Sequence, residues 1–223
     1  MAAEARTQAV SDAAWRRIEP LQLTPILEAA LDAFYEHGFH GTTVRDIARR
    51  VGVTVPALYY HHENKEAVLL ALVEISTRDL EERAVAAAEA AGDDPVARLS
   101  NVVESIVLLA TSRARLVAID TETRYLSAEN RRHYSAVRKQ VENLVTGIIK
   151  DGNVTGVFCA TDPAETARAI LGMCQSIPRW YHAEGRLTPE AAGKRYAEIA
   201  LKAAGWRAEP SDGSMRPTGR NGR

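Results

Sequence analysis

Side chains that can bind phosphate are concentrated between residues 43 and 65. Proteins bind the phosphate oxygens of nucleic acids with backbone N–H groups at helix starts, with hydroxyl groups and with cationic side chains. The residues that can supply such groups here are Thr43, Thr54, Tyr59, His61 and Lys65. This pattern indicates noncovalent binding of a phosphate backbone, with no covalent step.

Other side chains of the same stretch can read bases in a duplex groove. Val55, Pro56 and Ala57 can contact a thymine methyl group, and Tyr60 can stack on a sugar or reach a base edge. Arg45, in the first turn of a predicted helix, can reach a base or a phosphate. Residues 40–65 carry four Lys and Arg against two Asp and Glu, so the positive charge is local.

Each of these residues also has a purely structural interpretation. Thr43 and Thr54 are helix N-caps with or without a ligand. Tyr59 could be half-buried in a core, and Lys65 could be a solvated surface charge. Lys65 lies at a helix N-terminus, where the helix dipole disfavours a cation, and a bound anion would explain that placement.

Two short helices are predicted to position these side chains. The first follows Thr43, Gly52 breaks it in a turn that needs positive φ, and Thr54 begins the second. Two such helices form a helix-turn-helix, whose second helix enters the major groove of DNA. Two-helix corners also occur in enzymes, so this spacing alone leaves a role without DNA open.

The motifs that carry a wider match lie between residue 24 and about residue 72. They are Thr42-Thr43, Ile47-Ala48, Val51-Gly52-Val53-Thr54, Leu58-Tyr59, His61 and Lys65-Glu66. This pattern resembles the DNA-binding domain of the tetracycline-repressor (TetR/AcrR) family. The resemblance implies a bacterial transcription regulator with an N-terminal DNA-binding domain, a C-terminal effector pocket and a homodimer, and it implies phosphate contacts for Tyr59 and Lys65.

One position departs from the family pattern. Members usually carry Phe after the histidine, whereas this chain has His62. A Phe would pack beneath the second helix, so His62 leaves open whether its ring is buried there or tips toward the DNA backbone.

Helix punctuation continues through the rest of the chain. Asp94-Pro95, Asp162-Pro163 and Thr188-Pro189 predict helix starts. The helix that begins at Pro163 is expected to run to about residue 182, bent at Pro178. The predicted fold is all-α, with a three-helix N-terminal helix-turn-helix domain and a C-terminal helical bundle. The predicted divisions are a mobile arm (1–20), the DNA-binding domain (21–70), a ligand-binding and dimerisation domain (71–206) and a disordered tail (207–223).

Basic and aromatic residues in the second half are candidates for a ligand site. Trp180 could stack on a ligand ring, and Arg124 or Arg179 could bind a phosphate or carboxylate. The run Arg179-Trp180-Tyr181, with residues 152–158 upstream, resembles TetR-family members that sense acyl-CoA thioesters or related hydrophobic acids. The alternative is that Trp180 fills a core or a dimer interface and that Arg179 is a surface cation.

Two apolar stripes mark the last two long helices. They are Ala167, Ile170, Leu171, Cys174, Ile177 and Tyr181 on one, and Ala192, Tyr196, Ile199 and Ala203 on the other. Such stripes usually pack inside one chain, so the expected homodimer through these helices rests on the family resemblance.

Composition and motifs exclude several classes of protein. The 223 residues carry 28 Lys and Arg against 29 Asp and Glu, which excludes a uniformly basic nucleic-acid coat. Two cysteines exclude a disulfide framework, and no apolar run reaches the roughly 20 residues of a membrane span. The chain has no Gly-rich phosphate loop and no Gly-x-Ser-x-Gly motif, and Glu122 with His133 or Asp120 is only a weak metal-ligand set.

The sequence therefore predicts a cytoplasmic, ligand-responsive transcriptional repressor and no enzyme. It would bind a palindromic operator in double-stranded DNA as a dimer and would be released by a small hydrophobic effector, with an acyl-CoA as one candidate. We expect no cofactor, no metal and no membrane partner. The alternative is an all-helical small-molecule-binding protein or enzyme in which the helix-turn-helix is only structural.

Overall fold

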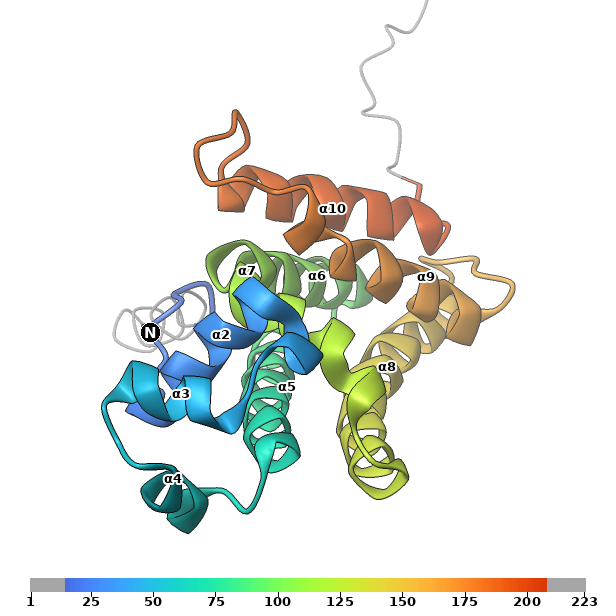
Figure 1. The fold of residues 1–223 in the computed structure, drawn as a ribbon. Coiled ribbons are helices and arrows are strands. Elements are labelled where there is room, and N and C mark those ends of the chain that lie inside the picture. The colour runs from blue at the N-terminus through green and yellow to red at the C-terminus, as the bar shows by residue number, and fades with distance from the viewer. Residues whose placement is uncertain (1–14, 208–223) are drawn as a thin grey trace, which may run out of the picture.

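The computed structural model describes residues 15–207, and this part of the chain is all helical, without a strand (Figure 1). The all-α prediction is confirmed. The first 14 residues of the predicted arm and residues 208–223 of the predicted tail lie outside the described residues.

Three helices form the N-terminal unit: α2 (Pro25–Gly41), α3 (Val44–Val51) and α4 (Val55–His61). Each begins where the sequence places a threonine N-cap, because the Thr24, Thr43 and Thr54 hydroxyls accept backbone N–H groups of the first turn. Within α2 the backbone is kinked at Gly38, whose φ of 70° lies in the left-handed region that glycine tolerates.

The longer helices form the rest of the molecule. They are α5 (Lys65–Glu89), α6 (Pro95–Ser112), α7 (Ala114–Ala118), α8 (Ala128–Thr155), α9 (Pro163–Gln175) and α10 (Pro189–Ala203), with 3-10 helices η1 (Ile119–Tyr125) and η2 (Ile177–Arg179). In Figure 1, α10 and α9 lie at the end of the molecule opposite α4, and α5 runs between the two parts.

The predicted helix from residue 163 to about 182 is wrong in its length. The α-helix ends at Gln175, and η2 follows instead of a bent continuation. Pro178 has no N–H to donate to the Cys174 carbonyl, and its ring disfavours α conformation at Ile177. The chain therefore tightens into a turn in which the Tyr181 N–H donates to the Ile177 carbonyl over 2.9 Å.

Two apolar cores share α5. The N-terminal core joins α2, α3 and α4 to the first half of α5, and it also takes in Leu116 of α7, Ile119 of η1 and Tyr134 of α8. The C-terminal core joins the end of α5 to α6, α8, α9 and α10. The segment from α7 to the start of α8 therefore belongs physically to the N-terminal core, although it lies within the second predicted domain.

The described part of the predicted mobile arm is packed against the helices. Trp15 is only 3% exposed and contacts Ala87 of α5 and Leu108 of α6. Arg16 Nη2 forms an ion pair with Glu104 Oε2 at 3.0 Å, and Arg83 Nη1 donates to the Arg17 carbonyl over 2.9 Å. Burial of the indole therefore anchors the described end of this segment on α5 and α6.

The two apolar stripes predicted to form the dimer interface differ in how deeply they are buried within the chain. On the first, Ala167, Ile170, Cys174, Ile177 and Tyr181 are buried inside the chain. On α10, Ala192 is buried, whereas Ile199 is 44% exposed. Among the described residues, no helix is long and apolar enough to cross a membrane.

Candidate functional site

The start of α3 is fixed by a reciprocal capping box. The Asp46 N–H donates to the Thr43 hydroxyl over 3.2 Å, and the Thr43 N–H donates to Asp46 Oδ2 over 3.0 Å. Hydrogen bonds from the Thr43 hydroxyl and N–H, followed by the charge of Arg49, hold the pKa of Asp46 below its usual value. Thr43 and Asp46 thus form a variant of the capping box, with Asp in the place of Glu.

The turn between α3 and α4 has the predicted geometry. Gly52 adopts φ 80° and ψ 26°, and the N–H groups of Gly52 and Val53 both donate to the Ala48 carbonyl over 3.0 Å. Leu58, fully buried, anchors α4 against the N-terminal core. With Leu58 facing inward, the opposite face of α4 is turned to solvent.

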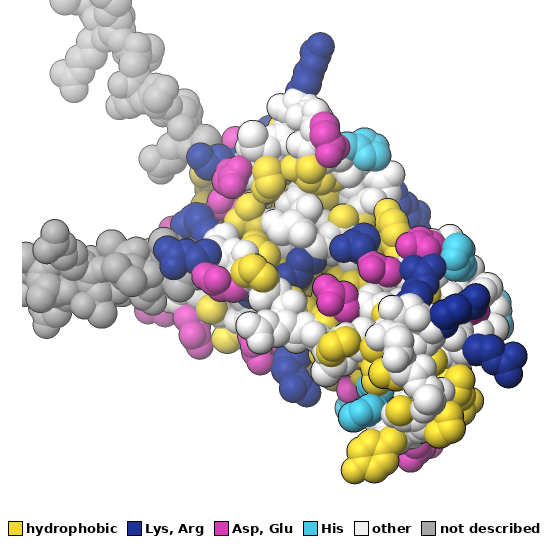
Figure 2. Space-filling view, turned by 60° about the vertical axis from the view of Figure 1, so that its left-hand side comes forward, with side chains coloured by type: hydrophobic (Ala, Val, Ile, Leu, Met, Phe, Trp, Pro, Cys, Tyr) yellow, Lys and Arg dark blue, Asp and Glu magenta, His cyan; other side chains and the backbone are white. Residues whose placement is uncertain are grey.

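The solvent face of α4 carries most of the predicted DNA-binding residues. Tyr60 is 88% exposed and Tyr59 is 48% exposed, while Val55 is half-buried against the N-terminal core. The remaining predicted residues of this face are exposed: Thr54, Pro56, Ala57 and His61. Figure 2 shows hydrophobic and histidine side chains projecting at the lower end of the molecule, where Figure 1 places α4, with Lys and Arg side chains beside them. These residues form one continuous projecting surface.

The arginines of α3 differ in whether they form ion pairs within the protein. Arg49 pairs with Asp46, and Arg50 Nη1 donates to Glu36 Oε1 over 3.2 Å. Arg45 is exposed and has no hydrogen bond or ion pair to any other described residue. Among the described residues of α3, Arg45 is therefore the arginine whose guanidinium has no partner within the protein.

Lys65 has a structural role that the sequence did not indicate. Its Nζ donates to the Phe39 carbonyl over 2.6 Å and to the Thr42 carbonyl over 2.7 Å, and it lies 4.3 Å from the centre of the Phe39 ring. Burial lowers the pKa of Lys65. These carbonyl oxygens, rather than a bound anion, explain a cation at the start of α5. A phosphate contact would have to use the one N–H group of the Lys65 ammonium that does not donate to these carbonyls.

His62 is half-buried at the C-terminal end of α4. Its backbone N–H donates to the Leu58 carbonyl over 3.0 Å. Burial, and then the neighbouring His61, lower the pKa of its imidazole. A neutral ring at the edge of the core therefore takes the place where the family pattern has Phe.

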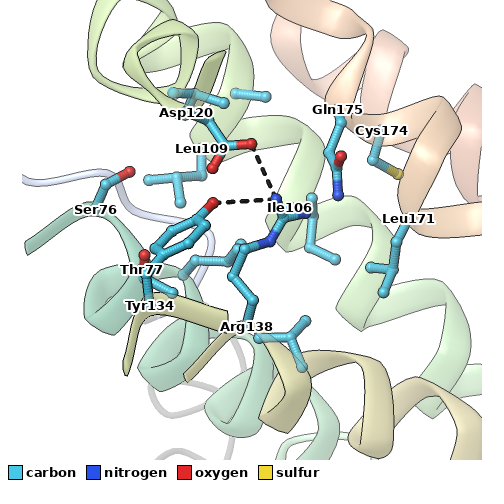
Figure 3. A pocket seen from close by; sticks show the side chains of 14 residues that line it. Ser76, Thr77, Ile106, Leu109, Asp120, Tyr134, Arg138, Leu171, Cys174 and Gln175 are labelled. Atoms are coloured by element: carbon cyan, nitrogen blue, oxygen red, sulfur yellow. Dashed lines mark hydrogen bonds and ion pairs between the residues drawn. The ribbon is translucent and has the colours of Figure 1, made fainter. Parts of the chain in front are cut away.

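A second candidate site is a cavity of about 80 Å³ between α5, α6, α8 and α9 (Figure 3). Its walls are mainly apolar: Leu80, Ile106, Leu109, Ala110, Val117, Val141, Leu171 and Cys174. Burial raises the pKa of the Cys174 thiol to about 12, so Cys174 contributes a small apolar surface to this wall and no thiolate.

One ion pair dominates the polar side of the cavity. Arg138 Nη1 donates to Asp120 Oδ2 over 2.9 Å and to the Tyr134 hydroxyl over 3.0 Å. Burial raises the pKa of the Asp120 carboxyl, and the charge of Arg138 opposes that effect. Ser76, Thr77 and Gln175 complete the polar lining.

None of the four predicted ligand residues lines this cavity. Arg124 and Arg179 are exposed, Trp180 is 40% exposed and stacks on Tyr196 at 6.0 Å, and Tyr181 is buried. The sequence reasoning missed Arg138, although a signal was present. Arg138 lies four residues after Tyr134 and three before Val141, so it is a cation on the apolar face of α8.

The weak metal-ligand set is not assembled. Glu122 Oε2 accepts the Phe39 N–H over 2.7 Å, and His133 Nε2 lies 3.0 Å from Glu74 Oε1. The described residues contain no group of three His, Cys, Asp or Glu side chains that could hold a metal ion.

The 3-10 helix η1 links the cavity to the helices of the N-terminal unit. Asp120 faces the cavity, and Glu122, two residues later, binds the Phe39 N–H at the kinked end of α2. Tyr125 stacks on Phe39 with ring centres 5.7 Å apart. A displacement of η1 would therefore also move the end of α2, where Lys65 Nζ donates to two backbone carbonyls.

Two family descriptions match the two parts of the chain. Residues 26–72 match "Bacterial regulatory proteins, tetR family", and residues 92–204 match "Tetracyclin repressor-like, C-terminal domain". Together they span the helix-turn-helix and most of the C-terminal core.

Individual relatives agree over most of the chain. The HTH-type transcriptional repressor KstR2 of Rhodococcus jostii is 29% identical over 183 residues, which are 80% of this chain and 88% of that protein. The structure of the TetR-family regulator PfmR of Thermus thermophilus is 29% identical and has a TM-score of 0.73, covering 79% of this chain and 97% of that chain. AibR in complex with isovaleryl coenzyme A and operator DNA is 28% identical and has a TM-score of 0.70, covering 79% and 94%.

Proposed function

The chain belongs to the TetR family of bacterial regulatory proteins, and from that membership we propose that it represses transcription by binding an operator through α4 and is released by a small apolar effector. The observation that carries the DNA-binding part is the outer face of α4. A helix held by a buried Leu58 and a left-handed Gly52 presents Tyr60, which is 88% exposed and which no described element covers. Exposed aromatic groups beside an unpaired arginine suit a duplex groove.

The proposed assembly is a homodimer through α9 and α10. The exposed apolar groups of this end are Trp180, stacked on Tyr196, and Ile199. A two-fold axis at this end would place two copies of α4 on successive major grooves, about 34–36 Å apart on a near-palindromic operator. In Figure 1, α9 and α10 lie at the end opposite α4, so a dimer through these helices would leave both copies of α4 free to reach DNA.

The proposed effector site is the cavity beside Arg138. Its apolar walls suit a small hydrophobic molecule. On its polar side, Asp120 lies two residues before Glu122, which accepts the Phe39 N–H at the end of α2. The related AibR is seen with isovaleryl coenzyme A and operator DNA, which supports an acyl thioester as a candidate effector here. An effector shifts operator occupancy only by its difference in affinity for the bound and released shapes. Such a protein would act in the cytoplasm and would be no enzyme.

The proposal is tested by mobility shift with the DNA upstream of the protein's own gene. We expect wild-type protein to bind it, and Tyr60→Ala to reduce discrimination between operator and random DNA by about tenfold, as for the loss of one base contact. Tyr35→Ala is the matched control, because Tyr35 is 58% exposed on α2 and lies outside the α4 face. Equal affinity of wild-type protein for operator and random DNA would contradict the proposal and favour a helix-turn-helix that is only structural.

A further inference from the structure

Resting on the proposed function, we infer that the cavity binds a short acyl group of a few carbons and that Arg138 binds its carboxylate or thioester carbonyl oxygen. The size of the cavity sets the length of the chain. Its volume of about 80 Å³ is about half that of an engineered apolar cavity of 150 Å³ that admits benzene. A chain of a few carbons therefore fits these walls without a rearrangement of the helices, whereas a long acyl chain does not.

The walls set the chemistry of the inner part of the ligand. Leu109, Val117, Val141 and Leu171 line the cavity with aliphatic side chains, and Cys174 is held as a neutral thiol. An apolar chain leaves no unpaired polar atom against these side chains, whereas a sugar or a polyamine would.

Arg138 sets the chemistry of the ligand's head. A guanidinium has five N–H donors, and the contacts to Asp120 and Tyr134 both use Nη1. No other described residue takes a hydrogen bond from Arg138 Nη2 or Nε. Figure 3 shows the guanidinium inside the cavity, with Asp120 and Gln175 on opposite sides of it in that view. The remaining donors suit the oxygen acceptors of a carboxylate or of an acyl carbonyl.

Asp120 competes within the protein for this guanidinium. It pairs with Arg138 at 2.9 Å, and its side chain is 38% exposed, so it can move away toward water when another oxygen arrives. A free carboxylate also meets the negative charge of Asp120, whereas a thioester carbonyl carries no charge. Removing that charge should therefore favour a carboxylate more than a thioester.

The test is calorimetric titration of the full chain with butanoate and with butanoyl-CoA, with butan-1-ol and CoA as controls for the missing acyl oxygen and the missing acyl chain. We expect at least one acyl probe to bind wild-type protein more tightly than either control. Arg138→Met should weaken that binding at least about tenfold. Arg132→Met, on the exposed face of the same helix, should leave it unchanged.

Asp120→Asn supplies a second variant with the opposite expected effect. It should tighten butanoate binding several-fold and change butanoyl-CoA binding little, which identifies the source of the acyl oxygen. A gain in affinity cannot arise from misfolding, so it keeps the test informative if Arg138→Met fails to fold.

The inference is overturned if butan-1-ol binds as tightly as the acyl probes, if a folded Arg138→Met binds them as wild type does, or if hexadecanoyl-CoA binds and neither short probe does. Wild-type protein that binds its operator but neither short probe would also overturn it and would leave the proposed function standing. Arg138-dependent binding of a short probe by a chain that ignores its operator would support the inference and contradict the proposed function.

Discussion

Lys65 illustrates how one residue fits two interpretations at the scale of the side chain. The sequence places a cation at a helix N-terminus, which favours a nearby anion. The structure supplies two carbonyl oxygens at the end of α2 instead, at 2.6 and 2.7 Å from Nζ. Both are partners that stabilise a positive charge, and the sequence does not indicate which one is near because Phe39 and Thr42 come from another helix.

Replacing Lys65 separates these interpretations. We expect Lys65→Met to lower the free energy of unfolding in urea by about 1–2 kcal/mol, because two carbonyls lose a charged donor while the apolar stem remains. Lys139→Met is the control, since Lys139 is an exposed lysine paired with Glu142. Unchanged stability together with a loss of operator affinity would show that the phosphate contact is the main role of Lys65.

At the scale of elements, η1 and the start of α8 are tied to α2 and to the start of α5 within the N-terminal core. Glu66 Oε1 of α5 accepts the Ser127 N–H and the Asn130 side-chain amide, each over 2.7 Å. Glu122 of η1 holds the kink of α2 in the same region. The carboxylates of Glu66 and Glu122 thus join α5 to α8 and η1 to α2, four elements that are separate in sequence.

The hydrogen bond from the Ser127 N–H holds the pKa of Glu66 below its ordinary value of 4.5. A carboxyl with a lowered folded pKa contributes stability that is present above its unfolded pKa and is lost as the pH falls through the folded value. We therefore expect Glu66→Gln to be less stable than wild type near pH 7, with a smaller difference near about pH 4 in urea unfolding. Glu129→Gln, in the exposed first turn of α8, should follow wild type at both pH values, and a difference for Glu66→Gln that is constant with pH would refute this role.

At the scale of the whole molecule, the two functional surfaces lie at opposite ends. The face of α4 is at one end, and α9 and α10, with Ile199 exposed on α10, are at the other, with the cavity and η1 between them. Glu104 of α6 is 7% exposed beneath α10, where a Cβ on Gly193 would come within 2.9 Å of its Cγ. Only glycine lets α10 approach that closely, and Arg16 supplies the countercharge.

The proposed dimer predicts that a charge placed on the exposed face of α10 abolishes dimerisation and weakens operator binding. Ile199→Glu should convert the dimer to a monomer in size-exclusion chromatography with light scattering, because it places a charge in an apolar interface. Operator affinity should fall by about a hundredfold, since one helix-turn-helix no longer raises the effective concentration of the other. Arg132→Glu, at the start of α8 and far from α10 in Figure 1, should remain dimeric. An Ile199→Glu variant that remains a dimer would place the interface elsewhere.

Local rules determined the helix-turn-helix from the sequence alone. N-caps at Thr43 and Thr54, a left-handed glycine at position 52 and the inward Leu58 act over a few residues, so their effects are the same in any tertiary setting. Their spacing also carried the resemblance to the family, and the exposed face of α4 follows from Leu58 by helical geometry.

Only the tertiary structure decided the ligand cavity, the role of Lys65 and the packing of Trp15. The cavity takes Thr77, Asp120, Arg138 and Cys174 from four separate elements, and Trp15 finds its partners on α5 and α6. Such contacts depend on how helices far apart in the chain come to lie side by side. The hydrophobic pattern of one helix shows which face is buried but not which residues of other helices it meets.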